Sequence, residues 1–172
     1  MNTTIKDVKY IDLKENIGNE GCLVAIEENS DIPINISRVF YVYGSDGKNR
    51  GNHAHVTTRQ VLVCLNGSAL VTCSDGEKYK TFILDRPDKG VFIPEMIWDS
   101  IDYAGENTIL LVLSSSPYDR EDYIEDFDSF KNKKLKWVLN MKISKIETPF
   151  PAISIDDFIP SVSLARAASA SF

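Results

Sequence analysis

His53 and His55 are the two histidines of this 172-residue chain, and they stand two positions apart in the segment Gly51-Asn-His-Ala-His55. Side chains two positions apart on a β-strand point to the same face, so both rings are expected to project together. Imidazole titrates near neutral pH and also binds metal ions. The pair therefore predicts an acid/base site or a metal site, with two surface histidines in a loop as the structural alternative.

The residues downstream extend this pattern. Gln60 follows the pair, Pro94 comes later, and Asp99 stands five positions after the proline. The arrangement resembles the two motifs of cupins, small double-sheet β-barrels in which an acid occupies the position of Gln60 and a third histidine that of Asp99. Because an amide replaces an anionic ligand poorly, we expect no metal and no cofactor. A two-histidine, one-carboxylate iron site made by His53, His55 and Asp99 is the alternative.

The elements around these residues are mostly short strands. Apolar, β-branched and aromatic runs predict strands at 22–26, 38–43, 60–65, 69–73, 80–84, 90–93 and 108–113. Asn66-Gly67 between two such runs predicts a hairpin, since both residues tolerate positive φ. Helical spacing of aromatic residues predicts a short helix within 117–130, followed by a solvated basic run at 131–136. The expected fold is all-β: a cupin double-sheet β-barrel (jelly roll) with a short C-terminal helix and an irregular tail.

Composition limits the partners and the organisation. The net charge of −6 and pI near 4.9 argue against nucleic acid as the main partner. Three cysteines without paired spacing predict no disulfide framework, in keeping with a reducing, cytoplasmic location. The polar amino terminus and the lack of a long apolar run predict neither a signal peptide nor a membrane segment. We expect a domain at 1–138 and an extension at 139–172, where the composition turns Ala/Ser-rich.

A narrower resemblance covers 20–133. It is carried by the stretches 21–29, 38–42, 50–55, 60–68 and 118–124, which include Arg50-Gly-Asn-His-Ala-His55 and Gln60-Val-Leu-Val-Cys-Leu-Asn-Gly-Ser68. Together they resemble the dTDP-4-dehydro-6-deoxyglucose 3,4-ketoisomerases of the WxcM-like, FdtA-type family. The resemblance implies conversion of a dTDP-4-keto-6-deoxyhexose to the dTDP-3-keto-6-deoxyhexose through an enediol. It also implies a role in bacterial lipopolysaccharide, O-antigen or S-layer glycan synthesis, and a homodimer, in one form with exchanged N-terminal strands.

The same resemblance implies roles for single residues. His53 is expected to remove the C3 proton as a base of near-neutral pKa. His55 would orient that base, donate to an oxygen or relay a proton. Tyr41 would stabilise the enediolate by a hydrogen bond, with a core aromatic as the alternative.

The substrate-binding predictions concern three side chains. Arg50 is the first candidate for binding the diphosphate and Arg38 the second, because a guanidinium binds phosphate oxygens bidentately. Surface or ion-paired arginines are the alternative. Gln60 is expected to hydrogen-bond the sugar or the histidine pair.

Two positions depart from the family pattern. Glu20 stands where the family has arginine or tyrosine, and Asp99 where it has histidine or arginine, so the C4 epimer of the product is not transferable. If Glu20 and Asp99 share a pocket, one carboxyl pKa rises and that acid can deliver the C4 proton. Otherwise Glu20 points to solvent and Asp99 is a structural acceptor. A metal-dependent cupin oxygenase and a non-catalytic sugar-nucleotide-binding cupin are the competing functions.

Overall fold

The computed structural model describes residues 3–45 and 47–143, and strands dominate this part of the chain. The strands are β1 (Lys9–Asp12), β2 (Glu15–Gly18), β3 (Gly21–Val24), β4 (Arg38–Gly44), β5 (Asn49–His55), β6 (Gln60–Asn66), β7 (Ala69–Ser74), β8 (Tyr79–Leu84), β9 (Lys89–Ile93), β10 (Trp98–Tyr103), β11 (Thr108–Ser114) and β12 (Tyr123–Ile124). Two single-turn 3-10 helices, Ile5–Asp7 and Arg120–Asp122, and the helix α1 (Phe127–Ile143) complete it.

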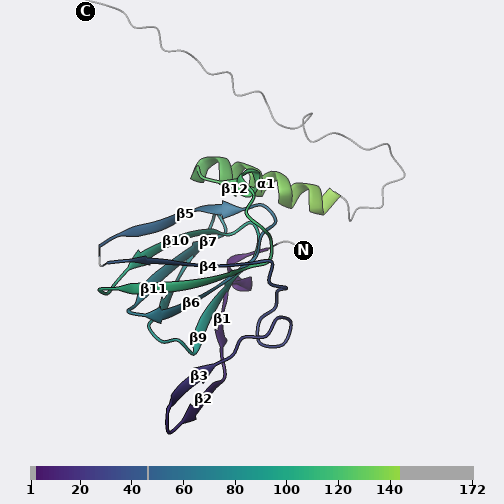
Figure 1. The fold of residues 1–172 in the computed structure, drawn as a ribbon. Coiled ribbons are helices and arrows are strands. Elements are labelled where there is room, and N and C mark those ends of the chain that lie inside the picture. Colours follow the sequence, from purple (N-terminus) through teal and green to yellow (C-terminus); the bar gives the residue numbers. More distant parts are fainter. Residues whose placement is uncertain (1–2, 46, 144–172) are drawn as a thin grey trace, which may run out of the picture.

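Ten of these strands form two facing sheets. Their strand orders are β1-β9-β6-β11-β4 and β12-β5-β10-β7-β8 (Figure 1), and neighbouring strands within each sheet pair antiparallel. Apolar side chains from both inner faces, such as Leu62, Val71, Phe82 and Leu110, fill the space between the sheets. Burial of this apolar surface is the main stabilising term for such a sandwich. The predicted all-β double-sheet barrel is confirmed.

The predicted hairpin at Asn66-Gly67 is wrong. Strand β6 pairs with β9 and β11, whereas β7 pairs with β8 and β10, so the turn crosses from one sheet to the other. Gly67 has a φ of +76°, and a Cβ there would lie 2.5 Å from Oγ1 of Thr108. The glycine serves this crossing, and the chain forms a hairpin only at the following turn, between β7 and β8.

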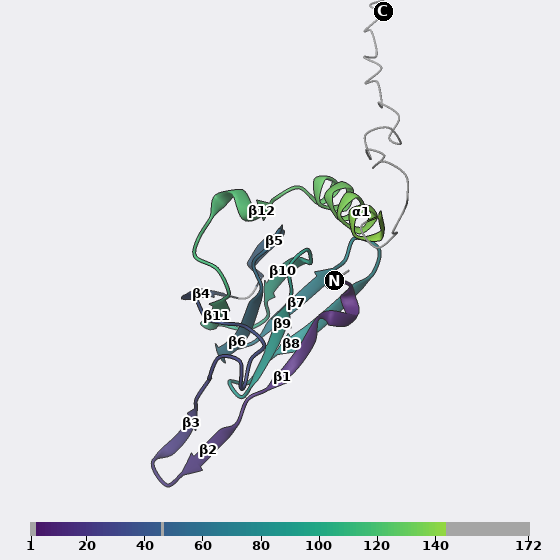
Figure 2. The same ribbon diagram turned by 90° about the vertical axis from the view of Figure 1, so that its right-hand side faces the viewer.

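The amino-terminal hairpin β2–β3 projects away from the barrel (Figures 1 and 2). Its side chains Ile17 and Leu23 are 78% and 59% exposed. Between this hairpin and β4, the chain covers part of the outer face of the first sheet with a second apolar cluster that includes Ile32 and Ile34. Strands β1, β2 and β10 were not expected from the sequence.

Helix α1 covers one end of the barrel, beside β5 and β12 (Figure 2). The predicted C-terminal helix is confirmed, but its predicted bounds of 117–130 are wrong: it begins at Phe127, and residues 120–124 form a 3-10 turn and a short strand. The basic run is exposed except for Lys134, which donates to the carbonyls of Thr3 and Met96 at 2.7 and 2.6 Å. The predicted boundary at 138/139 falls inside α1, and residues 144–172 of the predicted extension lie outside the described part.

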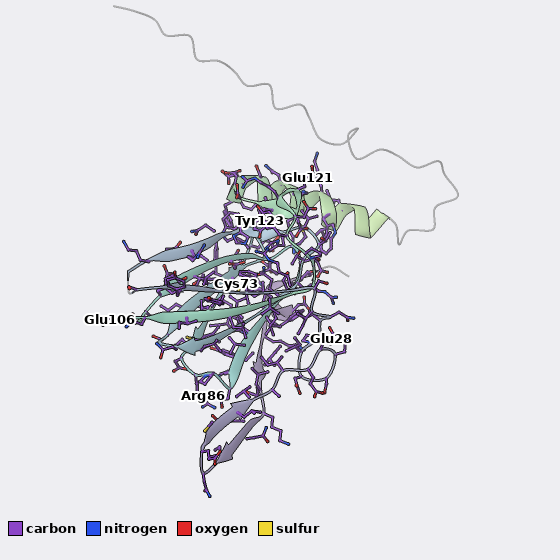
Figure 3. The ribbon with its side chains drawn as sticks, in the orientation of Figure 1. Glu28, Cys73, Arg86, Glu106, Glu121 and Tyr123 are labelled. Carbon is purple, nitrogen blue, oxygen red and sulfur yellow. The ribbon has the colours of Figure 1, made fainter. Side chains whose placement is uncertain are left out.

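The three cysteines are free thiols, with Cys64 and Cys73 buried in the core as small apolar residues. Figure 3 shows Cys73 inside the barrel. Among the described residues, no helix is long and apolar enough to span a membrane.

Candidate active site

A cavity of about 510 Å³ opens between the two sheets. Its walls come from β4, β6 and β11 on one side and from β5, β10 and β12 on the other. Arg38, Arg50, His53, Gln60 and Asp99 all line it. The barrel thus brings together five side chains that are distant in sequence.

A β-bulge in β5 sets which of its side chains face the cavity. Asp99 pairs with His53 and Ser100 with Gly51, so Asn52 has no partner on β10. In a regular strand without a bulge, Arg50 and His53 would point to opposite faces, because they are three positions apart. With it, Arg50 lies opposite Ile101 and His53 opposite Asp99, and these two partners share the inner face.

The bulge requires an unusual backbone. Gly51 and Asn52 both have positive φ, at +75° and +57°. A Cβ on Gly51 would lie 2.6 Å from Oδ1 of Asp99, so only glycine leaves room for that carboxyl group. Hydrogen bonds between the side chains of Asn52 and Asn49, and from Asn49 to Asp102 at 2.6 Å, hold the bulge at the cavity rim.

His53 and Asp99 lie opposite each other on β5 and β10, and both line the cavity. The Asp99 side chain is 3% exposed, and burial raises its pKa to about 6, although the nearby His53 acts in the opposite direction. No hydrogen bond from another described residue reaches the side chain of either one. An imidazole and a carboxyl group therefore lie on adjacent strands with their polar atoms available to a ligand.

His55 is placed differently, although its ring centroid lies 5.0 Å from that of His53. Its Nδ1 lies 2.9 Å from Oδ2 of Asp122, and its Nε2 lies 3.2 Å from Nε2 of Gln60. Burial, followed by the proximity of His53, lowers the pKa of His55. Both ring nitrogens are occupied within the protein, so His55 supports the site rather than lining the cavity.

Asp122 is a site residue that the sequence did not indicate. Its Oδ1 accepts from the backbone and the hydroxyl of Thr57, at 2.7 and 2.8 Å. Burial alone would raise its pKa, but the hydrogen bonds from Thr58, Thr57 and His55 outweigh this effect and lower it. An ionised Asp122 next to a neutral His55 follows. The two partners are 67 positions apart, which left no spacing signal.

Tyr123 is the second such residue. It lines the cavity, and its ring centroid lies 5.0 Å from that of His53 and 4.4 Å from that of His55. Figure 3 shows it at the end of the barrel near α1. Tyr41, expected near the sugar, points outward from β4 and is 67% exposed, so the cavity of the same chain does not include it.

The two arginines lie on opposite walls of the cavity. Arg38 is half-buried, with its guanidinium carbon 4.4 Å from the ring centroid of Phe40, and Arg50 is exposed at the rim. Within residues 3–45 and 47–143, neither arginine forms an ion pair. Their guanidinium groups are thus available for an anionic ligand.

The structure does not bring Glu20 to this cavity. Glu20 is exposed in the turn of the β2–β3 hairpin, whereas Asp99 is buried in the barrel. The raised pKa of Asp99 therefore comes from its own burial and not from a second carboxylate in the same chain. The proposed pairing of Glu20 with Asp99 is not present within one chain.

A metal site is disfavoured by the same contacts. His55 offers no free nitrogen, because Asp122 and Gln60 engage both of them. In the part of the chain that the structure describes, no three His, Cys, Asp or Glu side chains are placed to hold an ion.

The fold and the cavity define a cupin-type barrel whose interior presents an imidazole and a carboxyl group to the same space. The chain matches the family model FdtA, described as WxcM-like, C-terminal, over residues 6–135. It is 39% identical over 138 residues to the TDP-4-oxo-6-deoxy-alpha-D-glucose-3,4-oxoisomerase of Aneurinibacillus thermoaerophilus, covering 80% of this chain and 96% of that one. The chain therefore belongs to the FdtA, WxcM-like family of sugar 3,4-ketoisomerases.

Solved structures agree with this assignment. QdtA, a sugar 3,4-ketoisomerase from Thermoanaerobacterium thermosaccharolyticum solved in complex with TDP, is 34% identical with a TM-score of 0.74, over 77% of this chain and 98% of that one. A 3,4-ketoisomerase from Helicobacter canadensis is 35% identical with a TM-score of 0.73, over 75% and 98%. The predicted family and enzyme class are confirmed.

Proposed function

We propose that this protein converts a dTDP-4-keto-6-deoxyhexose to the corresponding 3-keto sugar inside the barrel cavity. The observation that carries the proposal is the presence of His53 and Asp99 side by side in a cavity that two arginines also line. Among the described residues, no hydrogen bond engages the side chains of His53 and Asp99, and neither arginine forms an ion pair. The charge of the arginines suits a diphosphate, while the acid/base pair suits proton transfer on the attached sugar. The relatives' names supply the substrate class.

The chemistry needs two proton transfers at carbon. His53 removes the proton from C3, and its electron pair forms the C3=C4 double bond as O4 becomes an enolate oxygen. O4 then takes up the proton that the O3 hydroxyl gives up, and Tyr123, which lines the cavity, is placed to donate a hydrogen bond to O4. Protonated Asp99 delivers a proton to C4, and the negative charge left on O3 forms the ketone at C3. No electrons leave the sugar, and no cofactor enters the balance.

Isotope exchange tests this proposal. Purified protein is incubated with dTDP-4-keto-6-deoxyglucose in deuterated water and followed by NMR. We expect deuterium to appear at C3 of the remaining substrate or at C4 of the product, with formation of the 3-keto sugar. The same spectra give the configuration at C4. Binding of the nucleotide sugar without any label would instead indicate a non-catalytic binding protein.

Metal dependence is checked in parallel. The exchange rate is measured before and after treatment with a chelator, with the metal content of each sample determined. We expect equal rates. A loss of exchange that returns when a metal ion is added would support the oxygenase-like alternative at His53, His55 and Asp99.

We infer further that the working form is a homodimer, and that the reaction takes place in the cytoplasm, where the free thiols of this chain stay reduced. The projecting β2–β3 hairpin exposes Ile17 and Leu23. Strand β4 is an edge strand whose outward side chains Tyr41 and Tyr43 are 67% and 74% exposed. Exposed apolar hairpins and edge strands are surfaces that a second copy commonly covers.

Light scattering of the purified protein and of an Ile17→Glu, Leu23→Glu variant tests this inference. We expect a dimer for the first and a monomer for the second. An exchange of hairpins would also carry Glu20 of one copy to the surface of the other. Glu20→Gln then separates the two predicted roles of this residue: a fall in turnover supports a shared site, whereas unchanged turnover supports a solvent-facing carboxylate.

A further inference from the structure

A chain of hydrogen bonds runs from Asp122 through His55 to Gln60, whose side chain lines the cavity. Asp122 accepts from Thr57 with one carboxylate oxygen and faces Nδ1 of His55 with the other, at 2.9 Å. The opposite ring nitrogen lies 3.2 Å from the side-chain nitrogen of Gln60. All three members are buried, with exposed fractions of 8% or less. Buried polar chains of this kind permit few alternative proton arrangements.

Donor and acceptor rules fix the direction of every bond. An ionised carboxylate has no proton, so Nδ1 of His55 must donate to Asp122. The lowered pKa of His55 keeps the ring neutral, and its Nε2 must therefore be an acceptor. The amide NH2 group of Gln60 is then the donor to Nε2. Its carbonyl oxygen has no partner among the described residues, and Gln60 lines the cavity.

We propose that Asp122 is a positioning residue that acts through His55 to present the Gln60 carbonyl oxygen to the cavity as a hydrogen-bond acceptor. The ligand group it takes is a hydroxyl donor on the sugar. A ketoisomerase substrate carries such a hydroxyl beside its ketone, and this hydroxyl must lose its proton during the reaction. In this respect the inference rests on the proposed function.

The geometry supports this role over a purely structural one. Burying a carboxylate against a neutral imidazole costs free energy. Packing does not require these polar groups, because an apolar pair of similar volume is often as stable. Here the carboxylate decides which tautomer His55 adopts, and the tautomer decides which end of the Gln60 amide faces the ligand. The catalytic pair His53 and Asp99 stays outside this chain of bonds.

Asp122→Asn reverses the polarity with little change in shape. The new amide keeps its oxygen on Thr57 and turns its NH2 toward His55, which makes Nδ1 an acceptor and moves the ring proton to Nε2. Gln60 must then rotate, so that its NH2 faces the cavity. We expect kcat to fall about tenfold to a hundredfold, the usual cost of losing a partner that orients a site residue.

Gln60→Glu added to Asp122→Asn restores the acceptor. One oxygen of the introduced carboxylate accepts from Nε2–H of His55, and the other faces the cavity. We expect this double variant to turn over about tenfold faster than Asp122→Asn alone, a coupling that independent sites would not show. A double variant no faster than Asp122→Asn would overturn the proposal.

A readout without activity separates this proposal from the proposed function. Because the chain contains two histidines, histidine labelled with ¹⁵N gives two ring spin systems, and a His53→Asn variant assigns them. We expect the Nδ1–H tautomer for His55 in the native protein and the Nε2–H tautomer in Asp122→Asn. The opposite native tautomer would overturn the proposal. The expected tautomers in a protein that labels no substrate would uphold this hydrogen-bond chain and sink the ketoisomerase function alone.

Discussion

The two histidines lie side by side on one strand, yet their surroundings differ sharply. His55 is enclosed by Asp122, Gln60 and the ring of Tyr123, with both nitrogens in use. His53 faces the cavity beside a buried Asp99 that no described side chain hydrogen-bonds. The site therefore has two parts. In the saturated half, His55, Asp122 and Gln60 hydrogen-bond one another and hold the geometry. In the unsaturated half, the side chains of His53 and Asp99 are left for a ligand.

The unsaturated half has an energetic cost. Burial of an unpaired carboxyl group disfavours its charged form, which is why the pKa of Asp99 rises to about 6. The saturated half shows the opposite outcome, because hydrogen bonds lower the pKa of the buried Asp122. Near pH 6, Asp122 is therefore ionised, whereas Asp99 is partly protonated and can act as an acid.

The largest effect is expected at His53. His53→Asn removes the base of the unsaturated half and should lower C3 exchange and turnover about a thousandfold, within the usual range for a general base. Binding of TDP, measured by calorimetry, should change little because the arginines are intact. The matched control is His55→Asn, for which we expect a smaller loss. Equal losses would break the division into two halves.

Asp99→Asn should have the next largest effect and should separate activity from stability. We expect turnover to fall about a hundredfold, since an amide cannot deliver a proton. Because the folded-state pKa of Asp99 lies above its ordinary value of 3.8, its buried charge destabilises the native state as pH rises from about 4 through 6. The variant should therefore be more stable than the native protein at pH 8, by about 3 kcal/mol, which is the free energy equivalent to a pKa raised from 3.8 to about 6.

Denaturant unfolding of both proteins at about pH 4 and about pH 8 checks the stability difference, which should nearly vanish at the lower pH. In the native enzyme, kcat/KM should decline as pH rises above about 6, because the acid form of Asp99 is lost there. A pH profile that is flat between about 5 and 8 would remove Asp99 from the reaction.

Arg50→Gln should have a smaller effect, which appears in binding. Loss of a guanidinium that holds a phosphate weakens the ground state and the transition state alike, so KM should rise about tenfold with kcat nearly unchanged. Arg50→Lys should recover part of the affinity, since it keeps the charge but not the bidentate geometry. A fall in kcat at constant KM would instead place Arg50 with His53 and Asp99 in the unsaturated half.

The smallest effects concern the tyrosines. Tyr123→Phe should lower kcat by about tenfold or less, as expected for one hydrogen-bond donor to a developing oxyanion. Tyr41→Phe, on the outer face, should leave kcat of the dimer within about twofold, a margin taken from the small effects of exposed substitutions. Steady-state kinetics of the two variants compares them directly. The reverse order would return Tyr41 to the role expected from the family.

Sequence patterns predicted what depends on local periodicity. The spacing of two between His53 and His55 predicted a shared face, and the apolar, β-branched and aromatic runs predicted four of the five strands of the first sheet and, in the second, β7 and β8. The same reasoning failed at Asn66-Gly67, because turn chemistry specifies a reversal of the chain but not which sheet the next strand joins. It failed again at 117–130, where aromatic spacing indicated a helix but long-range pairing with β5 made part of the segment a strand.

The parts of the site that sequence missed depend on contacts between distant segments. Asp122 reaches His55 across 67 residues, and Tyr123 joins the cavity only because β12 pairs with β5. Glu20 and Tyr41 were expected from the family pattern, and within one chain both lie outside the cavity. Glu20 lies outside because the β2–β3 hairpin projects from the barrel, which no local pattern encodes. Tyr41 stands three positions after Arg38 on β4, so strand alternation places it on the face opposite to the cavity-lining Arg38.

The unpaired Asn52 has a consequence for comparing sequences. In a straight strand, an arginine and a histidine face the same ligand when they are an even number of positions apart. Here Arg50 and His53 face the same cavity although they are three positions apart, because Asn52 is looped out of register. Deleting Asn52 alone would therefore restore a regular register and leave Arg50 and His53 on the same face, whereas replacing the bulge by a straight strand of the same length would turn Arg50 to the other face. Alignments of related barrels that place a single-residue gap in this segment are thus compatible with the same two side chains meeting the ligand.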